Sequence, residues 1–572
     1  MNKVDISVSQ LVGMIERGEL RLPEMQRQYV WRGTRVRDLI DSLYRGYPSG
    51  SILVWETDQE LPTRELAVSQ QKTPFVSGKL LLDGQQRLTS LSAILRGSPI
   101  KVRGRNKEID ILFNLDHPDS LLEYTEVNSD ENPSLVEEEI GDEMEDQEEL
   151  SIQERMKNMT FVVASKALAQ QANWISVTEV FRSDNDSQIL KRAGVKTLED
   201  SKYEKYSLRL KKLRSLRDYL YVMHVLPRDM RYEEVTEIFV RVNSLGVKLR
   251  GSDLALAQIT ARWRNSLTLL ESFQDECEQK WMTLDLGLLV RAMVVFSTGQ
   301  SRFDKVSTIP VSKLQEGWED AKNGLQFAIN FFHSNAGIED ESLLSSPLFF
   351  ITVAYFSHVH GQKLSSSEER LLLYWLYVAN ARGRYSRGSS ESILDADLAT
   401  VRKGGGPSEL LEAVRQQFGR LDIELSDIVG KGAASPLFSL VFLALRKKGA
   451  KDWRTCLGLS LTHQGKYHYI QYHHIFPKAL LKEKYDKQEI NEIANMAFVS
   501  GRLNREISAS APERYLPDIV VKQGREALVL QAIPLDETLY KIDAYRGFLE
   551  ERRKILVEEV NVFLKGIRNG QP

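Results

Sequence analysis

The stretch LLLDGQQRLTSL at residues 80–91 places three leucines directly before a polar turn, DGQQR at 83–87. The leucines predict a buried strand, and the apolar spacing after the turn predicts a helix that begins near Leu88. Free N–H groups at the start of a helix favour an anion, Gly84 permits close approach, and Arg87 offers a planar fork to phosphate oxygens. We therefore predict a phosphate site here; the alternative is an ordinary strand-to-helix turn.

The flanking sequence extends this unit in both directions. VSQLVGMIERGEL and TRVRDLIDSLYRGYP carry apolar residues at helical spacing, and GSILVWE is a short run of strand-forming residues. The second helix is expected to stop at Gly46 and Pro48. Residues 1 to about 120 are thus predicted to form a compact α/β unit.

Composition limits the function classes. The chain has 572 residues, 42% of them hydrophobic and 27% charged, which suits several globular domains. A net charge of -3 provides no global basic field, so any contact with DNA must be local. Two distant cysteines, Cys277 and Cys456, exclude a disulfide framework and indicate a reducing compartment. The N-terminus lacks the apolar segment of a signal peptide, and the longest uncharged stretch, 342–362, contains Pro347 and suits a buried helix. We expect a cytoplasmic protein without a membrane span.

Charge and periodicity divide the rest of the chain. Between 121 and 154 acids accumulate without Lys or Arg, which predicts that residues 121–155 form a mobile loop; a DNA-mimicking or autoinhibitory segment is the alternative. Helical periods dominate the middle of the chain, and turn signals separate them. The predicted organisation is α+β: residues 1–120 and 156–260 form an N-terminal domain around the acidic loop, 261–420 a helical domain, and 421–572 a C-terminal domain.

Histidines concentrate near the C-terminus, where four of the nine lie between 463 and 474. His473 and His474 end a strand-like run, and neighbouring strand residues point to opposite faces, so the pair suits two different tasks better than one metal ion. Asn495 follows downstream, and Asn504 begins a predicted helix nine residues later. A structural role for the histidine pair is the alternative.

Residues 471–516, QYHHIFPKALL to SAPERYL, resemble the HNH nuclease family, whose ββα-metal motif combines a hairpin and a helix. The resemblance implies that His474 is the general base, that His473 and Asn504 bind a divalent metal, and that Asn495 braces the loop that holds His474. His473 stands where many HNH enzymes have Asp. Mg²⁺ or Mn²⁺ is expected, and the imidazole shifts preference toward Mn²⁺, Ni²⁺ or Zn²⁺. Lys478, Arg502 and Arg505 are candidates for DNA phosphates, or are ordinary solvated charges.

Three segments of the N-terminal part, 21–56, 80–91 and 237–259, resemble the N-terminal domain of GmrSD-type restriction enzymes, a ParB/sulfiredoxin-like fold associated with nucleotides. Residues 374–398 look like the helical part of the same family. The resemblance implies a nucleoside triphosphate pocket (ATP, GTP or another) that contains Gln26, Arg27, Tyr29, Asp83, Gly84, Gln85, Gln86 and Arg87, closed by Arg241, Asn243 and Ser244. For the last three, a plain helix end is the alternative.

Together the two resemblances imply a type IV restriction enzyme, a nucleotide-regulated HNH endonuclease that cuts modified phage DNA, such as DNA with glucosylated hydroxymethylcytosine. Its expected partners are double-stranded DNA and a nucleoside triphosphate, and a homodimer is one arrangement we consider. Two alternatives stay open. In the first alternative, the chain is a nucleotide-dependent DNA-binding regulator without cleavage. In the second, it is an NTPase or a ParB-like nuclease in which the N-terminal domain carries the activity.

Overall fold

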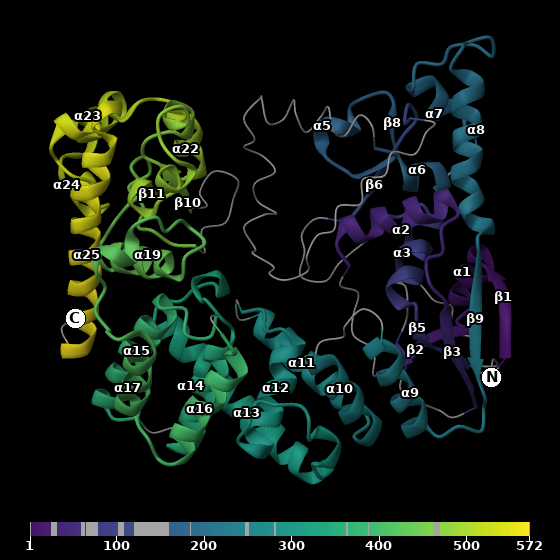
Figure 1. The fold of residues 1–572 in the computed structure, drawn as a ribbon, viewed down its shortest axis with the longest axis horizontal. Coiled ribbons are helices and arrows are strands. Elements are labelled where there is room, and N and C mark those ends of the chain that lie inside the picture. The colour runs from purple at the N-terminus through teal and green to yellow at the C-terminus, as the bar shows by residue number, and fades with distance from the viewer. Residues whose placement is uncertain are drawn as a thin grey trace. The chain divides into compact units, whose positions relative to one another are not determined.

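A computed structural model describes residues 2–23, 31–58, 63–64, 78–100, 108–118, 159–182, 185–245, 251–279, 282–361, 364–386, 388–461 and 470–570. The chain divides into two compact units, Met1–Leu269 and Leu270–Pro572 (Figure 1). The acidic block between 121 and 155 lies outside the described residues.

The first unit contains a mixed sheet of six strands in the order β1-β9-β3-β5-β2-β4 and a sheet of three strands in the order β7-β6-β8. In the larger sheet β3 pairs parallel with β9 and antiparallel with β5, and β5 pairs parallel with β2. The strands are β1 (Asn2–Ser7), β2 (Leu20–Pro23), β3 (Ile52–Thr57), β4 (Thr63–Arg64), β5 (Gly78–Asp83), β6 (Ile111–Asn114), β7 (Phe161–Val163), β8 (Trp174–Ser176) and β9 (Leu220–Leu226).

Helices of the first unit cover both faces of the larger sheet, and others pack on the smaller sheet or on one another. They are α1 (Val8–Glu16), α2 (Gly33–Arg45), α3 (Gln85–Leu95), α5 (Lys166–Ala169), α6 (Val177–Arg182), α7 (Ser187–Arg192), α8 (Tyr203–Arg214), α9 (Tyr232–Leu245) and α10 (Gly251–Arg262).

Side chains alternate along β3 and β5 because successive strand residues point to opposite faces. Val54 and Leu81 pack into the main core with α1, α2 and α3. Trp55 and Leu82 pack on the other face with Phe239 of α9. Both faces are therefore buried, which explains why the sequence of β5 is a continuous apolar run.

The turn between β5 and α3 depends on Gly84. This residue caps the helix with φ 100°, a left-handed conformation that side chains rarely adopt. A Cβ atom at this position would lie 2.5 Å from Cδ1 of Ile52. The helix begins at Gln85, three residues earlier than the sequence predicts, so Gln85, Gln86 and Arg87 form its first turn.

The second unit is mainly helical. Its helices, with α11 at the boundary, are α11 (Ser266–Gln279), α12 (Leu286–Thr298), α13 (Val311–Asn330), α14 (Leu348–Val359), α15 (Ser366–Ala381), α16 (Ser390–Arg402), α17 (Pro407–Phe418), α18 (Leu425–Ile428), α19 (Pro436–Lys448), α20 (Lys478–Leu481), α21 (Lys487–Ile490), α22 (Gly501–Ile507), α23 (Pro512–Gln523), α24 (Glu526–Leu530) and α25 (Tyr545–Asn569). A two-stranded sheet, β10 (Ile470–His474) with β11 (Met496–Ser500), lies near the end of the chain.

The uncharged stretch 342–362 contains α14, in which every residue from Phe349 to Ser357 is buried. It packs against α13 and α16. No described helix combines the length and apolar composition needed to cross a membrane.

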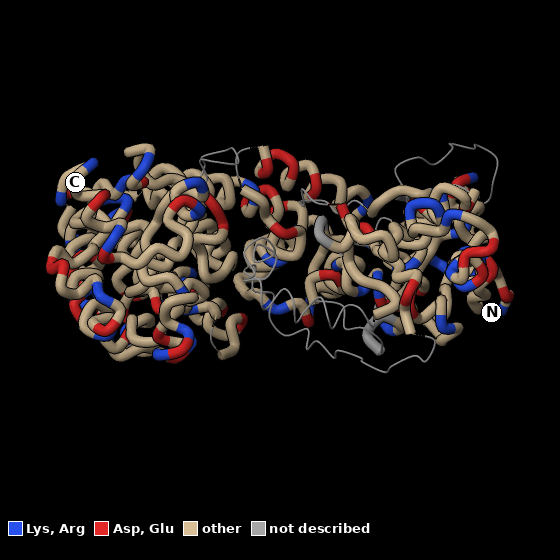
Figure 2. Tube along the Cα trace, turned by 90° about the horizontal axis from the view of Figure 1, so that it is seen from above, with Lys and Arg blue, Asp and Glu red and all other residues tan. Residues whose placement is uncertain are grey.

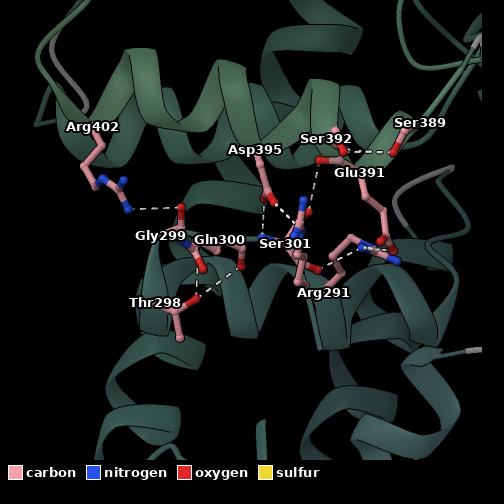
Figure 3. A network of polar contacts seen from close by, with 11 residues as sticks. Arg291, Thr298, Gly299, Gln300, Ser301, Ser389, Glu391, Ser392, Asp395 and Arg402 are labelled. Atoms are coloured by element: carbon pink, nitrogen blue, oxygen red, sulfur yellow. Dashed lines mark hydrogen bonds and ion pairs between the residues drawn. The ribbon is translucent and has the colours of Figure 1, made fainter. Parts of the chain in front are cut away.

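A polar network joins the end of α12 to α16 (Figure 3). The Ser301 N–H donates to Asp395 at 2.6 Å, and Arg291 donates to the Ser301 carbonyl at 2.8 Å. At the other end of α16, Arg402 donates to the Gly299 carbonyl at 3.3 Å. These bonds satisfy main-chain groups that follow the last turn of α12, where intrahelical partners are lacking.

Charged residues of both signs are interspersed over the described parts of both units (Figure 2). The combination of a mixed sheet in the first unit with a helical remainder confirms the α+β class. The division into two units places the segments 270–420 and 421–572 in one compact unit.

We predict that Gly84→Ala lowers the free energy of unfolding of the first unit. The left-handed backbone and the contact with Ile52 together cost about 1–3 kcal/mol. Urea denaturation measures the loss. Gly78→Ala is the matched control, because a Cβ at Gly78 meets nothing within 4 Å and its φ is not positive. Equal stability of the two variants would contradict this account of the turn.

Candidate functional site

A β-hairpin followed by a short helix brings the predicted C-terminal residues together (Figure 1). β10 and β11 pair antiparallel, with His473 opposite Ala497 and His474 opposite Met496. Ser500 ends β11 and caps α22 by accepting from the Leu503 N–H. The helix therefore starts at a fixed point of the hairpin.

His473 and Asn504 meet across the hairpin and the helix. Nδ1 of His473 lies 2.7 Å from Oδ1 of Asn504, and Nδ2 of Asn504 donates to Gln471 at 3.1 Å. Nε2 of His473 is buried and has no hydrogen-bond partner among the residues that the structure describes. The Tyr515 ring packs edge-on against the imidazole.

His474 lies on the other face of the strand. Its Nε2 lies 3.2 Å from Oδ1 of Asn491, and Nδ2 of Asn491 donates to the Lys487 carbonyl at 2.9 Å. Burial, and then the nearby Lys478 ammonium, lower the pKa of His474 to about 3. Burial lowers the pKa of His473 to about 4, against a smaller opposing effect of Asn504. Both imidazoles are therefore neutral near pH 7, so each has one ring nitrogen with a free lone pair.

Asn495 is fully buried immediately before β11. Its Oδ1 accepts from the Phe476 N–H at 2.9 Å, and its Nδ2 donates to the Phe476 and Ile490 carbonyls at 3.1 and 3.0 Å. The Ile475 N–H donates to the Asn495 carbonyl at 2.8 Å. One side chain thus ties together both ends of the loop that follows His474.

Side chains outside the hairpin support the free edge of β11. Gln531 donates to the Phe498 carbonyl at 2.6 Å and accepts from the Phe498 N–H at 3.2 Å. Buried Asp452 accepts from the Ser500 N–H at 2.7 Å. Directly after the other strand, the Tyr515 hydroxyl donates to the Ile475 carbonyl at 2.9 Å. The position of the two histidines is therefore fixed from several sides.

The C-terminal helix α25 anchors the segment 491–495, which carries the side-chain amides of Asn491 and Asn495. Arg553 forms two hydrogen bonds with the carboxylate of buried Glu492, at 2.6 and 2.7 Å. Fully buried Arg552 donates to the Ala494 carbonyl at 2.8 Å. Because bidentate Arg–carboxylate pairs are geometrically strict, Asn491 and Asn495 lie on an anchored loop.

The predicted cationic residues lie close by. Lys478 is exposed at the start of α20 and lowers the pKa of His474. Arg502 and Arg505 are exposed on α22, and Arg502 pairs with Glu506 at 3.2 Å. The three residues are thus placed on elements that flank the histidines.

The residues available for a metal are an imidazole and an amide. Among the residues that the structure describes, no group of three His, Cys, Asp or Glu side chains could hold a metal ion. Nδ1 of His473 and Oδ1 of Asn504 lie 2.7 Å apart and share a hydrogen bond. Because Oδ1 can only accept, Nδ1 carries the proton, and the free lone pair of the neutral imidazole is on the buried Nε2. An imidazole nitrogen and an amide oxygen are both ligands of divalent ions, so the chemistry of His473 and Asn504 suits such an ion, although Nδ1 and Oδ1 bond to each other in this structure.

In the first unit, Asp83 ends β5 and Arg87 follows in the first turn of α3. Arg87 donates to the main-chain carbonyls of Ser49 and Ser51 and pairs with Asp83 at 3.2 Å. Gln86 accepts from the Trp31 N–H at 3.2 Å. Much of the Arg87 guanidinium is thus used to hold the loop before β3, a contact that the sequence does not indicate.

The remaining predicted pocket residues are distributed as follows. Gln26, Arg27 and Tyr29 lie outside the described residues. Arg241, Asn243 and Ser244 lie in the last turns of α9, where Arg241 is exposed and pairs with Glu237 on the same helix. α9 contacts β5, the strand that ends at Asp83.

Comparison with known proteins identifies the class of the N-terminal part. Residues 8–260 match the sequence model of the GmrSD restriction endonuclease, N-terminal domain. This confirms the resemblance for that part of the chain, and the HNH resemblance stays a prediction. An uncharacterized protein of Methanocaldococcus jannaschii is 22% identical in an alignment that covers 96% of this chain and 97% of the relative.

Sequence reasoning missed Asn491, which contacts His474 directly. The residue is four positions before Asn495, in a segment that separates the two strands. The available signal was an asparagine directly after an amphipathic turn, a position where it commonly ends a short helix. That local explanation gives no reason to expect a contact with a residue 17 positions away.

We predict that Asn495→Ala destabilises the second unit. The change leaves the buried Phe476 N–H and two carbonyls without the amide, and each such group costs about 1–3 kcal/mol, so a loss of at least about 2 kcal/mol is expected. Chemical denaturation measures it. Asn330→Ala at the exposed end of α13 is the control. A variant as stable as that control would show that the amide does not hold the loop.

Proposed function

We propose that the chain is a metal-dependent DNA endonuclease of the HNH type that acts in restriction of modified phage DNA and is regulated by a nucleoside triphosphate. The observation that carries the cleavage proposal is the hairpin–helix arrangement, which sets His473 against Asn504 and places His474 on the opposite face. The similarity of residues 8–260 to a restriction endonuclease domain supports DNA as the substrate.

In this mechanism neutral His474 takes a proton from water while the water oxygen bonds to phosphorus. The P–O bond to the leaving strand end breaks, and solvent protonates the leaving oxygen. His473 and Asn504 would hold a divalent ion, which when bound supplies charge stabilisation at the phosphate and the leaving oxygen. Asn495 keeps the main chain after His474 in place, and Lys478, Arg502 and Arg505 are proposed to contact neighbouring phosphates.

The test is cleavage of DNA with and without glucosylated hydroxymethylcytosine, in the presence and absence of Mg²⁺ or Mn²⁺ and of ATP or GTP. We expect His474→Ala to lower the cleavage rate by at least about 100-fold, the lower end of what a general base contributes. His358→Ala, an exposed histidine on α14, is the control. Substantial cutting by purified His474→Ala protein would contradict the assignment of His474 as the general base. DNA binding without cleavage by the wild-type protein would favour the function of a regulator.

The nucleotide pocket is proposed at the β5–α3 turn. Arg87 holds the Ser49 and Ser51 carbonyls, and Asp83 is about one-third exposed beside it. The side of Asp83 that faces solvent suits a ribose hydroxyl or a hydrated metal.

We predict that Asp83→Asn weakens nucleotide binding, because a charge-assisted hydrogen bond is replaced by a neutral one, at a cost of up to about 1.5–3 kcal/mol. Titration calorimetry with ATP and GTP measures it. Asp38→Asn, an exposed acid of α2 paired with Arg37, is the control. Unchanged affinity in Asp83→Asn would leave the turn with a structural role alone.

A further inference from the structure

The side chain of Asn491 is held in one orientation. Its Nδ2 donates to the carbonyl of Lys487, the first residue of α21, which also accepts from the Asn491 main-chain N–H at 3.1 Å. The amide therefore directs Oδ1, which can only accept, toward Nε2 of His474 at 3.2 Å. If the amide were reversed, Oδ1 would face the Lys487 carbonyl, and two groups that can only accept would lie in contact.

The main chain at Asn491 is equally restrained. A Cβ atom at Gly432 would lie 2.8 Å from the Asn491 carbonyl oxygen, so glycine is required for this approach. The Ile493 N–H donates to the Lys431 carbonyl at 2.7 Å. The next residue, Glu492, accepts from the Gly430 N–H and is bound by Arg553. Asn491 is thus attached to both the 430–432 segment and α25.

A neutral imidazole carries one N–H, and the partner of one nitrogen decides which nitrogen has it. Because Oδ1 of Asn491 accepts, Nε2 of His474 must be the protonated nitrogen. Nδ1 is then the atom with a free lone pair. A histidine that serves as a base needs this lone pair on the nitrogen that faces the water.

We propose that Asn491 is a positioning residue that fixes the tautomer and ring orientation of His474, so that Nδ1 is the base. The inference rests on the proposed function, because it assigns a role within the same cleavage reaction. Asn491 touches the imidazole and not the reacting atoms. Its loss therefore affects the rate of the chemical step and not the affinity for DNA.

The experiment compares Asn491→Ala with wild type in the full chain. We expect kcat to fall by about 10- to 100-fold, the range typical for losing the partner that orients a catalytic or metal-binding imidazole. KM for DNA should change by less than about twofold. Asn491→Asp keeps an accepting oxygen and should recover most of kcat. Gln488→Ala, which removes an amide of the same helix that bonds to Gly430 and not to His474, is the control.

A second measurement does not depend on activity. With ¹⁵N-labelled histidine, wild-type protein should show His474 protonated at Nε2, assigned by its disappearance in His474→Ala. Asn491→Ala should show a mixture of tautomers, and Gln488→Ala should not. If Asn491→Ala kept the wild-type kcat and an unchanged Nε2–H signal, the role assigned to Asn491 would be overturned and the proposed function would stand. Absence of His474-dependent cleavage in the wild type would instead overturn the proposed function, and the assigned role with it.

Discussion

The buried guanidinium of Arg552 is the contact on which the C-terminal site depends. No carboxylate is bonded to it among the described residues; it donates instead to the carbonyls of Ala494, Gln531 and Ala532 at 2.8, 3.1 and 3.1 Å. Burial lowers its pKa to about 9, so it keeps its proton near neutral pH. A buried charge that loses its partner destabilises the folded state, and the partners of Arg552 are three main-chain carbonyls.

Those three carbonyls belong to the two segments that shape the site. Ala494 precedes Asn495, which closes the loop after His474. Gln531 supplies the amide that bonds both main-chain groups of Phe498 in β11. A single arginine of the last helix thus connects the loop, the strand and α25. Through these contacts, residues near position 550 help to position the main chain of the site near position 474.

The sequence predicted the parts of this architecture that follow from local patterns. Strand β5, the helix after it, the strand that ends at His474 and the helix around Asn504 all follow from apolar spacing and turn residues. What it could not indicate are contacts between distant residues. Arg87 has the chemistry of a phosphate ligand, yet it donates to Ser49 and Ser51, nearly 40 positions away. Asn491 looks like a helix end, yet it also faces His474, because the intervening fold brings them together.

The edge of β11 has a consequence for the two histidines. A two-stranded hairpin is marginally stable by itself, and a one-residue slip in its pairing turns every side chain to the opposite face. Gln531 bonds both main-chain groups of Phe498, as a neighbouring strand would, and Tyr515 bonds the carbonyl of Ile475, the residue that follows β10. The hairpin is therefore locked in one alignment, since any slip would exchange the environments of His473 and His474 and place each imidazole where the other is needed.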